Sequence, residues 1–229
     1  MSNEKLIKSK ERVQQHGEVF TPQWMVQKML DIEGIKEACK NIETTFLEPS
    51  AGDGNFLVAI LERKLESVTN QFNKGDWKTQ SLFALSSIYG IEFLPDNLEI
   101  ARSRMIIYYL NWYEEVFKEK LSSKSGIYKS AIYIIRRNIV RGNALTKKHP
   151  DYDIPILFNE WKRVPGSSSK VEKIEFKFSS LFENEETNGP IIPEGQLSLF
   201  DFEMDDEKKN ENFVSSGIID IKRIYQLGE

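Results

Sequence analysis

Apolar positions along this 229-residue chain follow two alternating patterns. Short runs of β-branched and aromatic residues at 44–47, 88–91 and 139–140 have the length and composition of buried strands. Between them, residues 55–72 and 95–117 repeat apolar side chains every three or four positions, which is typical of amphipathic helices. This alternation of strand and helix predicts an α/β fold with a doubly wound, mostly parallel central sheet.

The pattern is less regular after the second long helix. Residues 127–137 fit either a helix or a strand, and residues 154–158 predict a short fourth strand of the sheet. A Pro-Gly-Ser turn within residues 161–178 predicts a β-hairpin, and residues 218–225 predict one late strand. The hairpin would replace the later strands that a doubly wound sheet usually has.

Charge is distributed unevenly along the chain. Residues 183–212 hold ten acidic residues against two lysines, although the net charge of the whole chain is only −4. Such a segment buries too little apolar surface to fold, so we expect it to be disordered. The sequence therefore predicts one domain over residues 1–182, an acidic segment over residues 183–212 and a C-terminal strand within residues 213–229. The mildly basic domain is compatible with nucleic acid contact.

Composition excludes several classes of protein. No apolar run approaches the roughly 20 residues that span a bilayer, and the first 15 residues lack the apolar core of a signal peptide. The single cysteine, Cys39, cannot form an internal disulfide, which favours a reducing cytoplasm. Two histidines and one cysteine cannot build the usual zinc spacings, so we expect no structural metal.

A glycine-bearing turn, residues 51–54, joins the first predicted strand to the first long helix. Gly52 and Gly54 carry no Cβ, so the backbone can pass close to a ligand and aim the N–H groups of the following helix at it. Two acidic residues, Glu48 before this turn and Asp53 within it, suit hydroxyl and ammonium donors better than a pyrophosphate. An ordinary strand-to-helix turn is the alternative interpretation.

Three further segments accompany this turn in a fixed order: GEVFTP at 17–22, YGIEF at 89–93 and IVRGNAL at 139–145. Together with the glycine turn they resemble the S-adenosylmethionine-binding half of the adenine-N6 DNA methyltransferases of restriction–modification systems, including the modification subunits of type I enzymes. The resemblance covers about residues 12–160. It implies a methyltransferase-type, Rossmann-like domain that binds S-adenosylmethionine and acts on DNA.

The resemblance also assigns roles to individual residues. The Thr21 hydroxyl and the amides at the start of the next helix would bind the cofactor carboxylate, and Glu92 would accept hydrogen bonds from the ribose hydroxyls. Asn143 would accept a hydrogen bond from the adenine amine through its amide oxygen. A well-capped helix after Thr21 and an ordinary surface glutamate at Glu92 are the alternatives. The predicted cofactor-binding residues are Thr21, Pro22, Glu48, Pro49, Gly52, Asp53, Gly54, Glu92 and Asn143.

The chain departs from this family at the catalytic signature. The family has an Asn or Asp, two prolines and an aromatic residue after the fourth strand, and no Asn-Pro-Pro-Tyr occurs here. Asn159 and Trp161 follow the predicted fourth strand and are the candidates for orienting the target amine and stacking the flipped base. Two hypotheses follow: a DNA adenine methyltransferase, or a non-catalytic cofactor-binding subunit that needs a partner for catalysis and DNA recognition.

A short motif interrupts the acidic segment. Gln196, Leu197, Leu199 and Phe200 belong to a Gln-Leu-Ser-Leu-Phe sequence that resembles the peptide with which bacterial DNA-processing proteins bind the sliding clamp. Leu199 and Phe200 would fill an apolar pocket of the clamp. Alternatively, these apolar side chains fold back onto the hairpin as part of the core.

Overall fold

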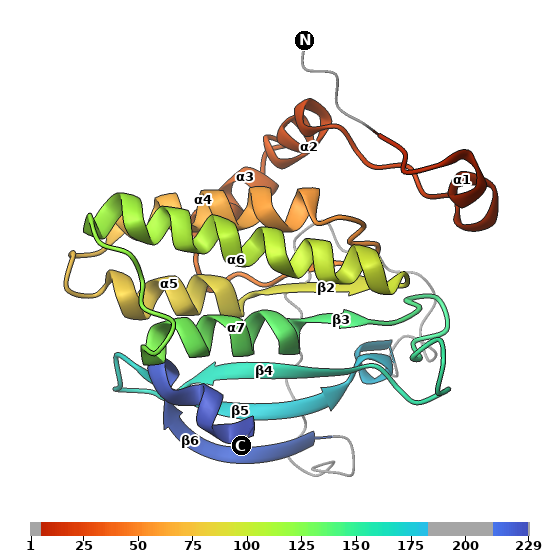
Figure 1. Cartoon of the computed structure of the whole chain (residues 1–229). Coiled ribbons are helices and arrows are strands. Elements are labelled where there is room, and N and C mark those ends of the chain that lie inside the picture. Colours follow the sequence, from red (N-terminus) through yellow and green to blue (C-terminus); the bar gives the residue numbers. More distant parts are fainter. Residues whose placement is uncertain (1–5, 183–212, 229) are drawn as a thin grey trace.

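Three parallel strands form the central sheet in the computed structural model, which describes residues 6–182 and 213–228. They are β1 (Phe46–Glu48), β2 (Ile88–Glu92) and β3 (Ile139–Arg141), and β2 lies between the other two. All three overlap the predicted strands, and β1 starts two residues later than predicted. Their carboxyl ends lie at one edge of the molecule, on the right in Figure 1.

Helices connect each strand to the next. Two of them, α4 (Asn55–Gln71) and α5 (Trp77–Ser86), lead from β1 to β2, while α6 (Pro95–Phe117) and α7 (Gly126–Asn138) lead from β2 to β3. Figure 1 shows α4 and α6 side by side above the sheet, and α5 and α7 running directly into their strands. The segment that fitted helix or strand is therefore helical. Before β1 the chain forms three shorter helices, α1 (Lys10–His16), α2 (Gln23–Leu30) and α3 (Ile35–Lys40).

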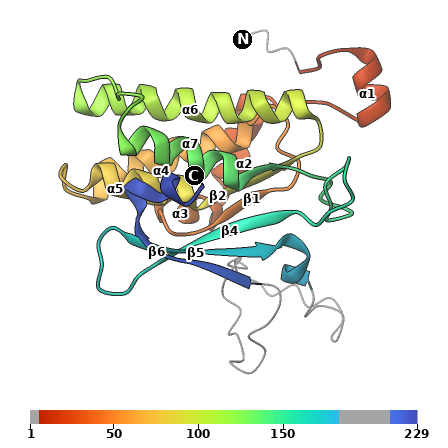
Figure 2. The same ribbon diagram turned by 60° about the horizontal axis from the view of Figure 1, so that its bottom comes forward.

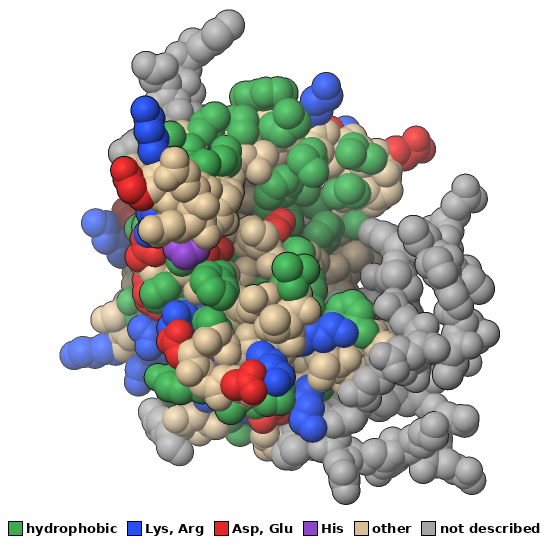
Figure 3. Space-filling view, turned by 90° about the vertical axis from the view of Figure 1, so that its right-hand side faces the viewer, with side chains coloured by type: hydrophobic (Ala, Val, Ile, Leu, Met, Phe, Trp, Pro, Cys, Tyr) green, Lys and Arg blue, Asp and Glu red, His purple; other side chains and the backbone are tan. Residues whose placement is uncertain are grey.

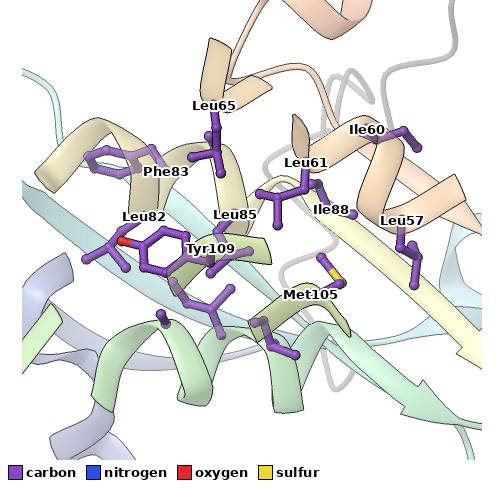
Figure 4. Close-up of a cluster of buried hydrophobic side chains, with 14 of the residues drawn as sticks. Leu57, Ile60, Leu61, Leu65, Leu82, Phe83, Leu85, Ile88, Met105 and Tyr109 are labelled. Carbon is purple, nitrogen blue, oxygen red and sulfur yellow. The ribbon is translucent and has the colours of Figure 1, made fainter. Parts of the chain in front are cut away.

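The core lies between these helices and the sheet. Leu57, Leu61 and Leu65 recur every four residues along α4 and are fully buried against Leu82 of α5 and Met105 of α6 (Figure 4). Burying one such side chain stabilises the fold by about 1.5–3 kcal/mol. The apolar stripe predicted from the sequence thus packs α4 and α6 against the sheet. This packing also positions the loops that follow the carboxyl ends of the strands.

A second, antiparallel sheet covers the other face of the parallel sheet (Figures 1 and 2). Its strands are β4 (Leu157–Arg163), β5 (Lys170–Lys177) and β6 (Phe213–Asp220), with β5 in the middle. Tyr89 and Ile91 of β2 pack against Phe158 and Phe176 of this sheet. The mixed α/β class, the parallel sheet and the late hairpin are confirmed. In the described part of the chain, the face where a doubly wound sheet would carry further helices is occupied by strands.

The later boundaries differ from the predicted ones. The predicted fourth strand at 154–158 is displaced, because β4 starts at Leu157 and pairs only with β5 among the described residues. The predicted late strand at 218–225 is β6, which ends at Asp220 and is followed by the 3-10 helix η4 (Ile221–Gly228). Ile221 and Ile224 are buried beside α7, a three-residue spacing that fits a 3-10 helix. The acidic segment and the clamp-like motif, with Gln196, Leu197, Leu199 and Phe200, lie outside the described residues.

Gly54 has a packing role. Its φ is +90°, and a Cβ there would lie 3.0 Å from the Cα and Cβ of Ala101 on α6. The absence of a side chain lets the start of α4 contact α6 directly. This close approach fixes the angle at which the glycine turn leaves β1.

One charged side chain is fully buried in the helical layer. Lys64 of α4 donates hydrogen bonds from Nζ to the carbonyl oxygens of Asn41 (2.9 Å) and Thr44 (2.7 Å), in the segment that leads into β1. Burial lowers the pKa of the Lys64 ammonium to about 7, because the charged form loses its hydration.

We expect Lys64 to make the free energy of unfolding rise with pH. Between pH 7 and about 10, Lys64 keeps its proton in the unfolded chain and has lost it in the folded chain. The free energy of unfolding therefore increases by up to ~1.4 kcal/mol for each pH unit in this range, and it decreases again as the pH falls toward 7. Lys64→Met should remove this slope, as seen by subtracting urea unfolding curves of the variant from those of the wild type at pH 7, 8 and 9. Lys36→Met at an exposed position is the matched control. A difference that does not change with pH would contradict the assignment.

Candidate functional site

A cavity of about 580 Å³ lies at the carboxyl ends of the three parallel strands. Its described walls come from four segments, residues 16–20, 49–52, 92–97 and 142–145. Each segment contains part of one of the four motifs found in the sequence, although the motifs are tens of residues apart. Figure 3 shows this edge of the molecule, where apolar, basic and acidic side chains are interspersed.

Glu92, the last residue of β2, joins two walls of the cavity. Its Oε2 accepts a hydrogen bond from the backbone N–H of Gly52 (2.7 Å), and its Oε1 accepts one from the N–H of Leu94 (2.9 Å). Burial raises the pKa of the Glu92 carboxyl, and these two hydrogen bonds oppose the rise. Each carboxylate oxygen accepts more than one hydrogen bond, so Glu92 keeps acceptor capacity for a ligand.

Glu18 provides a second carboxylate in the cavity wall. The residue is only 8% exposed, and its Oε2 accepts hydrogen bonds from Arg12 Nε (2.7 Å) and Asn97 Nδ2 (3.1 Å). Its Oε1 is buried and has no hydrogen-bond partner among the described residues. The sequence analysis missed Glu18, because GEVFTP was interpreted through the helix start at Thr21. An acid next to Gly17 was the signal that could have identified it.

The wall that contains Glu18 is held largely by charged contacts. Helix α1 has no buried residue, and Arg12 extends from it to form an ion pair with Asp96 at the start of α6 (2.9 Å) as well as with Glu18. Lys8 also pairs with Asp96 (2.7 Å). The N-terminal wall therefore depends on ionic contacts, whereas the other three walls continue into the packed core.

The chemistry of the lining indicates the kind of ligand that fits. Among the described residues, two carboxylates line the cavity and no Lys or Arg does. A phosphate or pyrophosphate in such a site would be repelled by Glu18 and Glu92, and no Lys or Arg of the described lining would contact it. The cavity suits a ligand with hydroxyl groups and positive charge.

Four of the predicted cofactor-binding residues line this cavity, namely Pro49, Gly52, Glu92 and Asn143. Asn143 is oriented differently from the prediction. Its amide oxygen accepts hydrogen bonds from the N–H groups of Leu145 (3.0 Å) and Thr146 (3.2 Å), closing a turn. The amide nitrogen is thus the group that remains to contact a ligand.

The two acids predicted at the rim do not line the cavity. Asp53 forms an ion pair with Arg104 of α6 (2.7 Å), and Glu48 accepts a hydrogen bond from the N–H of Ser50 (3.0 Å). Burial raises the pKa of both carboxyls, and Arg104 opposes this at Asp53. The acids that face the cavity are Glu18 and Glu92 instead.

The remaining predicted contacts, Thr21, Pro22 and Gly54, also lie outside the cavity lining. Pro22 is the N-cap of α2, one position later than the predicted Thr21 cap, and it has no N–H or side-chain acceptor with which to cap the helix. The carbonyl of Thr21 accepts a hydrogen bond from Asn55 Nδ2 (2.8 Å), which attaches this segment to the start of α4.

Asn159 and Trp161 are not at this cavity. Both belong to β4 and are 2% and 6% exposed. Trp161 Nε1 donates a hydrogen bond to Asn138 Oδ1 (2.8 Å), and the Asn159 carbonyl accepts one from the Tyr89 hydroxyl (2.9 Å). Figure 1 gives the reason: β4 runs opposite to β2 and β3, so it moves away from the cavity edge as it proceeds. The predicted catalytic pair is therefore part of the core.

Comparisons with known proteins give no relative: no family model, no curated protein and no solved structure matches this chain. Within the described residues, no helix is long and apolar enough to cross a membrane. The same residues contain no group of three or more histidine, cysteine or acidic side chains placed to hold a metal ion.

We expect Asp96→Asn to loosen the N-terminal wall without unfolding the body. The neutral side chain loses its ion pairs with Lys8 and Arg12, and partly exposed pairs contribute up to about 1 kcal/mol each. Amide hydrogen exchange in α1 should rise by about two- to tenfold while exchange in α4 stays unchanged. Glu99→Gln, which removes a pair with Arg102 on the same helix, is the matched control. Equal exchange in α1 for both variants would show that the ionic contacts do not hold this wall.

Proposed function

We propose that the cavity binds S-adenosylmethionine and that this chain is the cofactor-binding subunit of a DNA adenine-N6 methyltransferase. The observation that carries the proposal is the pairing of two carboxylates with the absence of Lys and Arg among the described lining residues. S-adenosylmethionine has ribose hydroxyls, an ammonium, a sulfonium and one carboxylate, so its net charge is positive, and it has no phosphate. Nucleotide cofactors with a pyrophosphate fit this lining poorly.

The lining residues have functional groups that suit the adenosine part of that ligand. Glu92 would accept hydrogen bonds from the ribose hydroxyls while the N–H of Gly52 keeps it in place. The amide nitrogen of Asn143 would contact the adenine ring, and Phe93 would supply an aromatic face beside it. The parallel order β1-β2-β3, with a cavity at the carboxyl ends, is compatible with the Rossmann-like methyltransferase half that the sequence resembles.

The placement of β4 favours a subunit over a complete enzyme. Transfer of a methyl group to an adenine amine depends mainly on alignment of the amine with the sulfonium carbon. The groups proposed from the sequence for that alignment, Asn159 and Trp161, are buried away from the cavity. A partner chain would supply the alignment and the reading of the DNA sequence.

Isothermal titration calorimetry should detect S-adenosylmethionine binding to the wild-type chain. Glu92→Gln should weaken it by about tenfold or more, because hydrogen bonds to a charged acceptor are worth about 1.5–3 kcal/mol. Gly52→Trp should abolish binding, since its side chain starts 3.4 Å from Phe20 and fills the cavity. Glu160→Gln, at a separate cavity of about 200 Å³, is the control and should bind normally. Unchanged affinity in both cavity variants would reject this site, provided that their thermal unfolding matches the wild type.

A tritiated-methyl transfer assay on mixed-sequence DNA separates the subunit from the enzyme. We expect the chain alone to bind the cofactor and to transfer no methyl group to DNA, because Asn159 and Trp161, the alignment groups predicted from the sequence, lie outside the described lining of the cavity. Incorporation by the chain alone that is lost in Asn159→Ala would contradict the subunit proposal and restore catalysis to β4.

A further inference from the structure

The wall of the cavity contains an incompletely satisfied acid. Glu18 is more than nine-tenths buried, yet its Oε1 has no hydrogen-bond partner among the described residues. Leaving a buried charged acceptor unpaired costs free energy, typically more than for a neutral group. A group with this cost in the lining of a cavity is poised to receive a hydrogen-bond donor.

The charges around Glu18 indicate which donor it would receive. Arg12 pairs with its Oε2 from the outer side, and Asn97 donates to the same oxygen. On the cavity side the nearby charged group is Glu92, whose pKa is raised by burial first and by the negative charge of Glu18 as a smaller cause. With Asp96 and Lys8 of the same network included, three carboxylates and two cationic side chains leave one negative charge at this wall, so a cationic donor is favoured over a neutral one.

We propose that Glu18 binds the ammonium group of the amino-acid part of the ligand, an inference that rests on the proposed binding of S-adenosylmethionine. The other acids near the glycine turn are less suited to this role. Asp53 is paired with Arg104, and neither Asp53 nor Glu48 lines the cavity. Glu18 lies in the wall formed by residues 16–20, and the ribose contact, Glu92, is contributed by the end of β2.

Contact with the ligand requires only a small movement. Glu18 Oε1 exposes less than 1 Å² to solvent, so the carboxylate must turn about its last side-chain bond to meet a donor in the cavity, and the contacts of Oε2 with Arg12 and Asn97 adjust with it. That torsion has a broad minimum and a low cost. Because Arg12 and Asn97 hold the other oxygen, the ligand ammonium would join an existing network that extends to Asp96 at the start of α6.

Calorimetric titration of Glu18→Gln with three ligands tests the assignment. S-adenosylhomocysteine and 5′-methylthioadenosine share adenosine and a thioether, and only the first carries an amino-acid part. We expect Glu18→Gln to weaken S-adenosylhomocysteine by about 10- to 100-fold and to leave 5′-methylthioadenosine within about twofold. S-adenosylmethionine should lose the same factor as S-adenosylhomocysteine.

Each other pattern has a separate meaning. Equal losses for S-adenosylhomocysteine and 5′-methylthioadenosine would overturn the assignment of Glu18 and leave the proposed function intact. A loss confined to S-adenosylmethionine would assign Glu18 to the sulfonium and overturn the ammonium contact. A wild-type chain that binds none of the three ligands would refute the proposed function, and this inference with it.

Arg12→Gln is the matched variant, because it breaks the same ion pair from the other side and keeps the carboxylate. If Glu18 binds the ammonium, removal of the competing guanidinium should preserve or raise the preference for S-adenosylhomocysteine over 5′-methylthioadenosine. If Glu18 acts only by holding α1 in place, both variants should lower that preference alike, which would refute direct binding. Hydrogen exchange in α1 reports whether the helix has loosened in each variant.

Discussion

The carboxylate of Glu92 joins the two loops on which the cavity depends. It accepts the N–H of Gly52 from the turn after β1 and the N–H of Leu94 from the turn after β2, so neither loop can shift without loss of a hydrogen bond to a charged acceptor. The contact of Gly54 with Ala101 fixes the helices that follow these turns. The strand-end walls are therefore set by the core before any ligand arrives, which reduces the ordering cost of binding.

The N-terminal wall follows a different physical principle. It belongs to a segment whose helix, α1, buries no residue, and Arg12 connects it both to Glu18 and to Asp96. Ionic contacts near the surface are weak individually and depend on salt, so this wall is the part of the cavity best able to adjust to a ligand. Three walls of the cavity continue into the packed core, and one is held by ion pairs. The cavity therefore combines a fixed surface with an adjustable one.

The three parallel strands and the helices α4 and α6 were predictable because their signals are local. Leu57, Leu61 and Leu65 define one face of α4 within a single segment, and the glycine turn indicates where this helix begins. The set of four motifs also indicated which loops would meet. The sequence did not predict which acid faces the cavity, because the answer depends on ion-pair partners elsewhere in the chain. Asp53 pairs with Arg104 of α6, whereas Glu18 pairs with Arg12 and stays in the wall. The amide oxygen of Asn143 was likewise assigned to a ligand when its own turn uses it.

The direction of β4 has the largest functional consequence, and no local pattern encodes it. A fourth parallel strand would end at the cavity, and the residues after it would reach the ligand. In this chain β4 begins near that edge and runs toward the opposite edge. Its start is close to the end of β3, since a Cβ on Gly142 would lie only 2.4 Å from the side chain of Ile156. Tyr89, which contacts Asn159, precedes Glu92 by three residues, or about 10 Å along a strand. Trp161 lies farther on, bound to Asn138 at the end of α7. The antiparallel pairing that buries these side chains thus removes them from the cavity, so under the proposed function the alignment groups would come from another chain.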